Sequence, residues 1–314
     1  MTVATRTGFE FEAAIESYRR NQRTRLAEQT LNRVYVPRLR MFAAFLNEQG
    51  MPTDVGSIRR EHLEAYIEWL QHSAPGRAGA GQKSATVSIS YRTLRTFFRW
   101  LVSEDELKHS PMERMRAPTV VEEAPQVLTP AQLEKLYKVC AGRSFDDRRD
   151  QALMRLLADS GMRRGEIAGL TVDDLHLDGE GLILLRGETS KSRRGRVVPL
   201  SRGGLGALDR YLRVRHSHPK AHLTDLWLGK RGRLTDSGIL QIVERRGRQA
   251  GIPGLHPHRF RHTFAHSMLV RGATEGAVAA LAGWKDRAML ARYGRSAAVE
   301  RAVAEFRRLD RALS

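Results

Sequence analysis

The chain has 314 residues, one cysteine and a formal net charge of +18 at pH 7. One cysteine excludes a disulfide framework and a cysteine-rich zinc site, and the longest apolar stretches, such as residues 41–46, are too short to span a bilayer. A charge of this size favours nucleic acid or an anionic membrane surface as partner. Because Arg6 and Glu10 interrupt any apolar run at the start, we expect no signal peptide and a soluble, cytoplasmic protein.

The first part of the chain is predicted to be helical. Apolar residues recur at helical spacing over residues 9–22, 17–50 and 61–73, and the Gly-rich, basic stretch 74–84 is predicted to be a loop. Up to residue 118 we count 18 Lys and Arg against 13 Asp and Glu, a net charge of +5. The remaining residues have 35 and 22, a net charge of +13, so the basic character is not confined to one tail.

Residues 84–106 form the most informative predicted helix of this half. Ser84 or Thr86 is a plausible N-cap. Two stripes recur at spacings of three and four, one apolar and one basic. The apolar stripe is Tyr91, Leu94, Phe98 and Leu101, and the basic stripe is Arg92, Arg95 and Arg99. Such a helix suits packing on a bundle with its basic face on DNA, and the alternative is a merely solvated face.

A second domain is predicted to begin near residue 119. Residues 116–127 contain two prolines and no helical period, and Thr129 and Pro130 then have the pattern of an N-cap and first helical residue. Residues 170–200 alternate apolar and polar positions between turn signals, which predicts two or three short strands with a tight basic turn at 190–195. Helical patterns resume at 204 and continue to the end. We therefore predict a mainly α protein with a small antiparallel sheet, divided into domains 1–118 and 119–314.

The stretch HPHRFRHTFAH, residues 256–266, has four histidines and two arginines but no acidic residue. Histidines four apart can bind a metal, but a zinc hydrolase of the H-E-x-x-H type needs a glutamate where this chain has Arg259. Arg261, one turn away, would repel a cation. Phosphate is the better partner, because a guanidinium can hold two phosphate oxygens and a nearby histidine can move a proton.

Other polar residues of this half suit the same anion. Glu166 follows Arg163 at a spacing that can orient an arginine, and Lys191 lies in the basic turn, where its ammonium could reach a leaving oxygen. Trp284 offers an indole N–H donor. Tyr293 lies among arginines that would stabilise its phenolate for attack on phosphorus. Taken singly, each of these residues could equally be an ordinary core or surface residue.

These segments, in this order, resemble the tyrosine recombinases, the phage-integrase family that includes the Xer and Cre recombinases and lambda integrase. SGMRRGEI at 160–167 resembles the first family box, Lys191 precedes VVPL as the hairpin lysine does, and HRFRH at 258–262 matches H-x-x-R-H. AGW at 282–284 stands where the family usually has L-G-H, and a tryptophan there is similar to Cre. Tyr293 follows at the spacing of the family nucleophile. The likeness covers residues 119–314 and, more loosely, the helical half.

The resemblance implies a site-specific recombinase that cleaves and rejoins DNA through a 3′-phosphotyrosine. The implied catalytic set is Arg163, Lys191, His258, Arg261, Trp284 and Tyr293, with Glu166 and His262 in support. Arg163 and Arg261 would hold the phosphate, His258 could take the tyrosine proton and Lys191 would protonate the leaving oxygen. No metal, ATP or other cofactor is implied.

The resemblance also implies a helical core-binding domain and a catalytic domain that form a clamp around double-stranded DNA carrying specific sites, with four protomers on two sites. The terminal helix, with Val299, Val303, Phe306 and Leu309 on one side, would dock on a neighbouring protomer or pack on its own domain. The chain is too short to add an arm-binding domain of the lambda type. Two alternatives stay open: a catalytically silent DNA-binding relative, and a type IB topoisomerase-like enzyme that reseals without exchanging partners.

Overall fold

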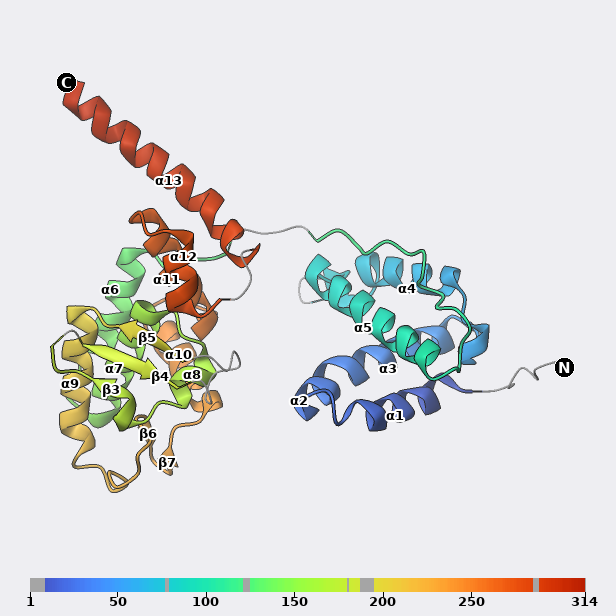
Figure 1. Cartoon of the computed structure of the whole chain (residues 1–314), viewed down its shortest axis with the longest axis horizontal. Helices are drawn as coiled ribbons and strands as arrows, with labels where there is room; N and C mark the ends of the chain where they lie inside the picture. Colours follow the sequence, from blue (N-terminus) through green and yellow to red (C-terminus); the bar gives the residue numbers. More distant parts are fainter. Residues whose placement is uncertain are drawn as a thin grey trace. The chain divides into compact units, whose positions relative to one another are not determined.

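The computed structural model describes residues 9–76, 79–120, 125–179, 181–186, 195–284 and 288–313. The chain divides into two compact units, Met1–Glu123 and Ala124–Ser314, which are considered separately below. Figure 1 shows that both units are built mainly from helices and that the extended strands belong chiefly to unit 2, which confirms the predicted fold class. None of the helices in the described residues combines the length and apolar character that a bilayer span requires.

Unit 1 is a small helical bundle. Its elements are α1 (Phe11–Gln22), α2 (Glu28–Thr30), the π-helical turn η1 (Leu31–Tyr35), α3 (Val36–Glu48), the 3₁₀ turn η2 (Val55–Ser57), α4 (Arg60–His72), the short strands β1 (Pro75–Gly76) and β2 (Gly79–Ala80), and α5 (Ser84–Ser103). Aromatic rings fill the space between the helices. The ring of Phe97 on α5 lies 5.1 Å from that of Phe11 and 5.4 Å from that of Tyr18 on α1. Burial of these large rings stabilises the bundle.

The sequence predicted this unit with three errors. The helical pattern of residues 17–50 is interrupted after α1 and resumes only at α2. The predicted loop 74–84 contains the antiparallel pair β1–β2. Neither Ser84 nor Thr86 is the N-cap of α5, because Lys83 occupies that position and makes no side-chain capping bond. The apolar stripe of α5 is buried as predicted.

Unit 2 surrounds a small sheet with helices. Its elements are α6 (Pro130–Val139), α7 (Phe145–Ser160), α8 (Arg164–Ala168), the 3₁₀ turn η3 (Val172–Asp174), β3 (Leu175–His176), β4 (Leu182–Leu185), β5 (Arg196–Pro199), α9 (Arg202–Arg215), β6 (Leu228–Gly229), β7 (Gly232–Arg233), α10 (Asp236–Gln249), α11 (Pro257–Val270), α12 (Glu275–Ala282) and α13 (Ala288–Leu313). α13 projects from this unit (Figure 1). Strands β3, β4 and β5 pair antiparallel in chain order, as predicted, with Ile183 opposite Val198.

Two local features of unit 2 test the predicted secondary structure, namely the start of α6 and the segment between α9 and α10. Thr129 is the N-cap of α6, its hydroxyl accepts the backbone N–H of Gln132, and Pro130 opens the helix, which confirms that prediction. The predicted continuous helical run from 204 is wrong, because the antiparallel pair β6–β7 lies between α9 and α10. Two-residue strands are too short for a period of two to show in a sequence.

The core of unit 2 fixes α7, the helix that leads into the functional site. Asp150 on α7 is fully buried and accepts hydrogen bonds from Arg149 and from Arg245 and Arg246 of α10. α7 ends at Gly161, whose φ of +56° suits glycine. A Cβ at this position would lie 2.4 Å from Cδ1 of Phe264, so α11 can approach the end of α7 only because the residue is glycine.

Candidate active site

The first site residue, Arg163, lies at the N-cap of α8, directly after the turn that ends α7. The carboxylate of Glu166 accepts the backbone N–H of Arg163 at 2.8 Å and its guanidinium at 3.1 Å. Nη2 of Arg163 donates to the carbonyl of Gly283 at 3.1 Å. One buried carboxylate and one carbonyl therefore hold the backbone N–H and the guanidinium of Arg163. The side chain has little conformational freedom left.

The histidine-rich stretch lies on α11, where the helical period decides which of its side chains share a face. His256 is the N-cap and Pro257 opens the helix. His258, Arg261 and His262 lie at spacings of three and four and so share one face, and the rings of His258 and His262 lie 4.4 Å apart. Arg259 points elsewhere, because its guanidinium donates to the carbonyl of Val127.

Arg261 is the most deeply buried of the three site arginines. It is 2% exposed, and Nη1 donates to the carbonyl of Gly161. Its Nη2 is buried and has no hydrogen-bond partner among the residues that the structure describes. Burial, with repulsion from Arg163, lowers the pKa of Arg261 to about 9. A buried guanidinium with an unsatisfied donor is costly unless an anion completes it, so this geometry marks an anion site.

A cavity of 310 Å³ opens in front of these cations. Arg163, His258 and Arg261 supply its polar wall, and Met162 and Leu240 supply apolar wall. Desolvation, followed by repulsion from Arg261, lowers the pKa of His258 below its ordinary value. His258 is itself exposed, so a ligand can reach the imidazole from solvent.

Tyr293 of α13 lies beside the same face of α11. It is 1% exposed, and its hydroxyl is hydrogen-bonded to Nδ1 of His262. Its ring stacks on that of Trp284 at 5.4 Å and 12°, and the guanidinium carbon of Arg261 lies 4.9 Å from the Trp284 ring centre. Trp284 thus contacts both Arg261 and Tyr293, and the imidazole at the tyrosine hydroxyl is that of His262.

Arg196, at the start of β5, is a residue that sequence reasoning missed. Its side chain is 9% exposed, and Nη1 and Nη2 donate to the two carboxylate oxygens of Glu166 at 3.1 and 2.7 Å. Burial would raise the pKa of Glu166, but the bonds from Arg196 and Arg163 outweigh it and lower the pKa to about 2. In the sequence Arg196 is one of several cations in residues 191–196, and no local pattern indicates that it pairs with Glu166.

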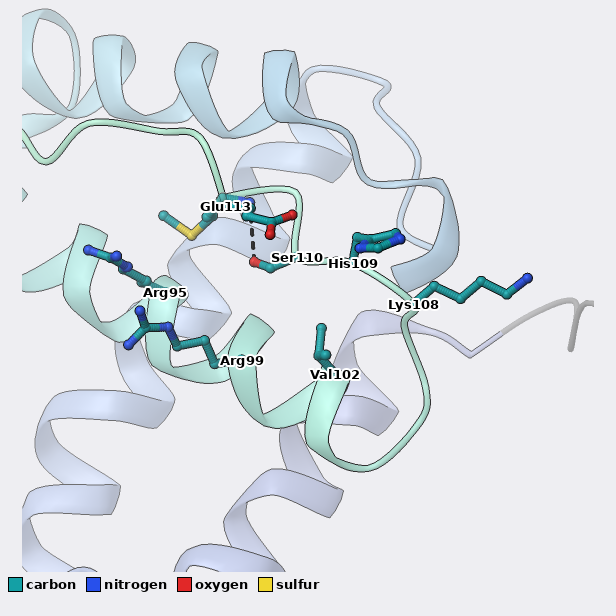
Figure 2. Close-up of a pocket in the computed structure, with 8 residues that line it drawn as sticks. Arg95, Arg99, Val102, Lys108, His109, Ser110 and Glu113 are labelled. Atoms are coloured by element: carbon teal, nitrogen blue, oxygen red, sulfur yellow. Dashed lines mark hydrogen bonds between the residues drawn. The ribbon is translucent and has the colours of Figure 1, made fainter.

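The basic stripe of α5 lies on unit 1. Arg92 and Arg99 are exposed and Arg95 is half-buried. Figure 2 shows Arg95 and Arg99 reaching from α5 into a cavity of 280 Å³, whose other lining residues include Lys108 and His109 on the following segment. The acidic Glu113 lines the same cavity, so its wall carries both signs of charge with cations in excess.

The structure brings most of the predicted set together. Arg163, His258 and Arg261 share one cavity, and Trp284 and Tyr293 form a stack behind it with His262. Lys191 lies outside the described residues. Within the described part of the chain no group of three or more His, Cys, Asp or Glu side chains could hold a metal ion.

Comparison with known proteins gives the family. The model of the phage integrase family matches residues 126–300, more than half of the chain. The tyrosine recombinase XerC of Thermodesulfovibrio yellowstonii is 34% identical over 200 residues, which span 62% of this chain and 65% of that relative. The tyrosine recombinase XerD of Listeria monocytogenes serotype 4b is 28% identical over 259 residues, 81% and 84% of the two chains.

Solved structures share the fold at lower identity. The XerH site-specific recombinase bound to palindromic difH in a post-cleavage complex gives a TM-score of 0.72 at 19% identity over 96% of this chain and 86% of that one. A lambda integrase tetramer bound to a Holliday junction gives 0.66 at 18% identity over 89% and 78%. The chain therefore belongs to the phage integrase family and is a tyrosine recombinase.

Proposed function

We propose that the chain is a site-specific DNA recombinase that cleaves and rejoins strands through a 3′-phosphotyrosine at Tyr293. One observation carries the assignment of the site: a tyrosine hydroxyl is bonded to an imidazole, and the tyrosine ring stacks on a tryptophan that contacts a buried arginine. One N–H of this arginine has no partner among the described residues. This set contains a nucleophile, a proton acceptor and an incomplete anion site. It matches phosphoryl transfer to an enzyme oxygen.

The cavity in front of Arg261 would receive the scissile phosphate. Arg163 and Arg261 would hold its non-bridging oxygens, and the free Nη2 of Arg261 would gain its missing acceptor. His258 would add a hydrogen bond from the solvent side. Since the donors are fixed before the substrate arrives, they stabilise the five-coordinate transition state without reorganising.

The proton of Tyr293 would pass to His262. The family resemblance offered His258 for this role, but the tyrosine hydroxyl is bonded to Nδ1 of His262. As the Tyr293 oxygen bonds to phosphorus, its proton moves to His262 and the bond from phosphorus to the 5′ oxygen breaks. The resemblance assigns protonation of that leaving oxygen to Lys191.

The rest of the chain would hold the duplex. Residues 1–118 would act as the core-binding domain and residues 119–314 as the catalytic domain, with specific double-stranded sites as the substrate and the nucleoid as the place of action. Arg92, Arg95 and Arg99 on α5 would contact backbone phosphates. Phosphate contacts of this kind dominate affinity and weaken steeply with salt.

Strand exchange would use four protomers on two sites, with α13 as a contact between them. Val299, Val303 and Phe306 on α13 are 65%, 45% and 69% exposed. Large apolar side chains exposed together on one helix indicate a docking surface. The solved lambda integrase relative is a tetramer on a Holliday junction, which supports this arrangement.

Covalent trapping tests the proposed chemistry. Wild type and Tyr293→Phe are expressed in cells, denatured with detergent, and the DNA that stays attached to protein is sequenced. We expect attached DNA for wild type only, ending at one recurrent sequence. Attachment by both proteins would refute Tyr293 as the nucleophile, and attachment by neither would count against cleavage. Relaxation of plasmid without that sequence would favour the topoisomerase alternative.

A matched histidine pair tests the proton route. On a duplex carrying the trapped sequence, His262→Gln should slow covalent attachment at pH 7 by about 10²-fold, the lower range for general-base catalysis. His262→Gln should leave equilibrium binding of the duplex unchanged, because it removes no phosphate contact. His258→Gln should weaken binding, because it loses one. The reverse pattern would assign the proton to His258.

A further inference from the structure

Arg196 joins three separate segments of unit 2. Its backbone lies at the start of β5, its Nη1 and Nη2 donate to Glu166 of α8, and its Nε donates to the carbonyl of Leu281 in α12 at 2.8 Å. All three nitrogens of the guanidinium are therefore in use, and the side chain is 9% exposed. Arg196 is not among the described residues that line the cavity in front of Arg261.

The acceptors of Arg196 are the groups that hold the phosphate-binding residues. Glu166 fixes both the backbone and the guanidinium of Arg163. Leu281 lies three residues before Trp284, whose ring contacts both Arg261 and Tyr293. Through these two contacts one guanidinium influences the position of Arg163 on one side of the site and of Trp284 on the other.

Gly283 shows how closely this packing is fitted. Its φ is +65°, and a Cβ on it would lie 2.7 Å from Nη1 and 2.9 Å from Cζ of Arg196. The carbonyl of the same residue accepts Nη2 of Arg163 at 3.1 Å. Arg196 and Arg163 therefore meet at the end of α12, and the glycine leaves the space that Arg196 occupies.

We propose that Arg196 is a positioning residue for DNA cleavage, which acts through Glu166 on Arg163 and through the end of α12 on Trp284. This inference rests on the proposed function. A lysine cannot replace the arginine fully, because one ammonium cannot reach two carboxylate oxygens and a carbonyl on the far side with fork geometry. A neutral side chain of similar length would leave Glu166 buried with one cationic partner fewer.

The test compares Arg196→Met and Arg196→Lys with Arg215→Met. Arg215 is also buried and donates to the carbonyls of Leu223, Asp225 and Leu226, but it has no contact with the site. Single-turnover covalent attachment and equilibrium binding are measured on the trapped duplex, and each protein's melting temperature is recorded. Misplacement of a catalytic group by about 1 Å can lower a rate about 10²-fold. We expect a rate loss of about this size for Arg196→Met, while its affinity for the duplex stays within about threefold of wild type.

A double variant separates positioning from general stability. If Arg196 acts partly through Glu166, then the rate loss of Glu166→Gln with Arg196→Met should be smaller than the product of the two single losses, whereas independent residues give multiplying losses. Arg215→Met should lower the melting temperature and leave the rate per folded molecule unchanged. Arg196→Lys should fold like wild type and fall between wild type and Arg196→Met in rate.

The possible outcomes distinguish a failure of the Arg196 inference from a failure of the proposed function. Three results would overturn the inference and leave the proposed function intact. The first is a wild-type attachment rate in Arg196→Met or Arg196→Lys. The others are multiplying losses in the double variant and an equal rate loss in Arg215→Met. Failure of the wild type to attach would instead count against the proposed function, because every comparison above is made relative to its rate.

Discussion

Neutralising Glu166 should destabilise unit 2 strongly and in a pH-dependent way. Its side chain is 2% exposed and lies against the guanidiniums of Arg163 and Arg196. Glu166→Gln keeps the shape and removes the charge, so two cations lose their shared anion. Removing one partner of a buried ion pair typically costs about 3–5 kcal/mol.

The pKa of Glu166 gives an independent magnitude. The pKa falls from 4.5 to about 2 on folding, and one pKa unit is worth about 1.4 kcal/mol, so ionisation contributes about 3 kcal/mol at pH 7. A carboxyl with a lowered folded-state pKa stabilises the protein above its unfolded pKa, and this contribution is lost as pH falls from about 5 toward 2. The stability gap between wild type and Glu166→Gln should therefore be roughly 2 kcal/mol smaller at pH 3 than at pH 7.

Urea-dependent hydrogen exchange of α7 peptides measures this gap for unit 2 alone. The control is Asp209→Asn, which removes an exposed carboxylate paired with Arg213 and should change stability by less than about 1 kcal/mol. Equal stability of Glu166→Gln and wild type at pH 7 would refute the reasoning. A gap that stays constant from pH 7 to pH 3 would show that the lost charge is not the cause.

Three further predictions concern other parts of the chain. Phe97→Ala should destabilise unit 1 by about 3–5 kcal/mol because it empties the centre of the aromatic core, as measured by urea-dependent exchange of α1 peptides; a loss below about 1 kcal/mol would contradict this. Arg95→Ala with Arg99→Ala should reduce the slope of log affinity for the trapped duplex against log salt by about 2, whereas Arg213→Ala on α9 should leave it unchanged. Phe306→Glu should prevent higher-order complexes in a gel-shift assay while single-protomer binding persists; unaltered complexes would exclude α13 as the contact.

The chemistry of the site was predictable wherever one helix sets the geometry. His258, Arg261 and His262 follow one another at helical spacing, so the sequence alone places them on one face of α11. The same holds for Arg163 and Glu166, which are three residues apart at the start of α8. Family resemblance then supplied Tyr293 and Trp284, whose contact with α11 no local pattern encodes.

The missed features depend on contacts between distant segments. Arg196 pairs with a carboxylate thirty residues earlier, and a basic run gives no sign of which cation will turn inward. Both His258 and His262 face the site, so only the docking of α13 decides which imidazole meets the Tyr293 hydroxyl. The pair β6–β7 was missed because its strands have two residues each.

The pairing of charged side chains in the site favours an anion in the cavity. Glu166 is shared by Arg163 and Arg196 and leaves Arg261 without a carboxylate partner. Arg261 instead has a backbone carbonyl, the face of Trp284 and one unpartnered N–H, and its pKa is lowered to about 9. This arrangement is unfavourable in the free protein and improves as negative charge enters the cavity. If the cavity receives the scissile phosphate as proposed, the donors that meet its non-bridging oxygens are already in place and need not reorganise as charge develops.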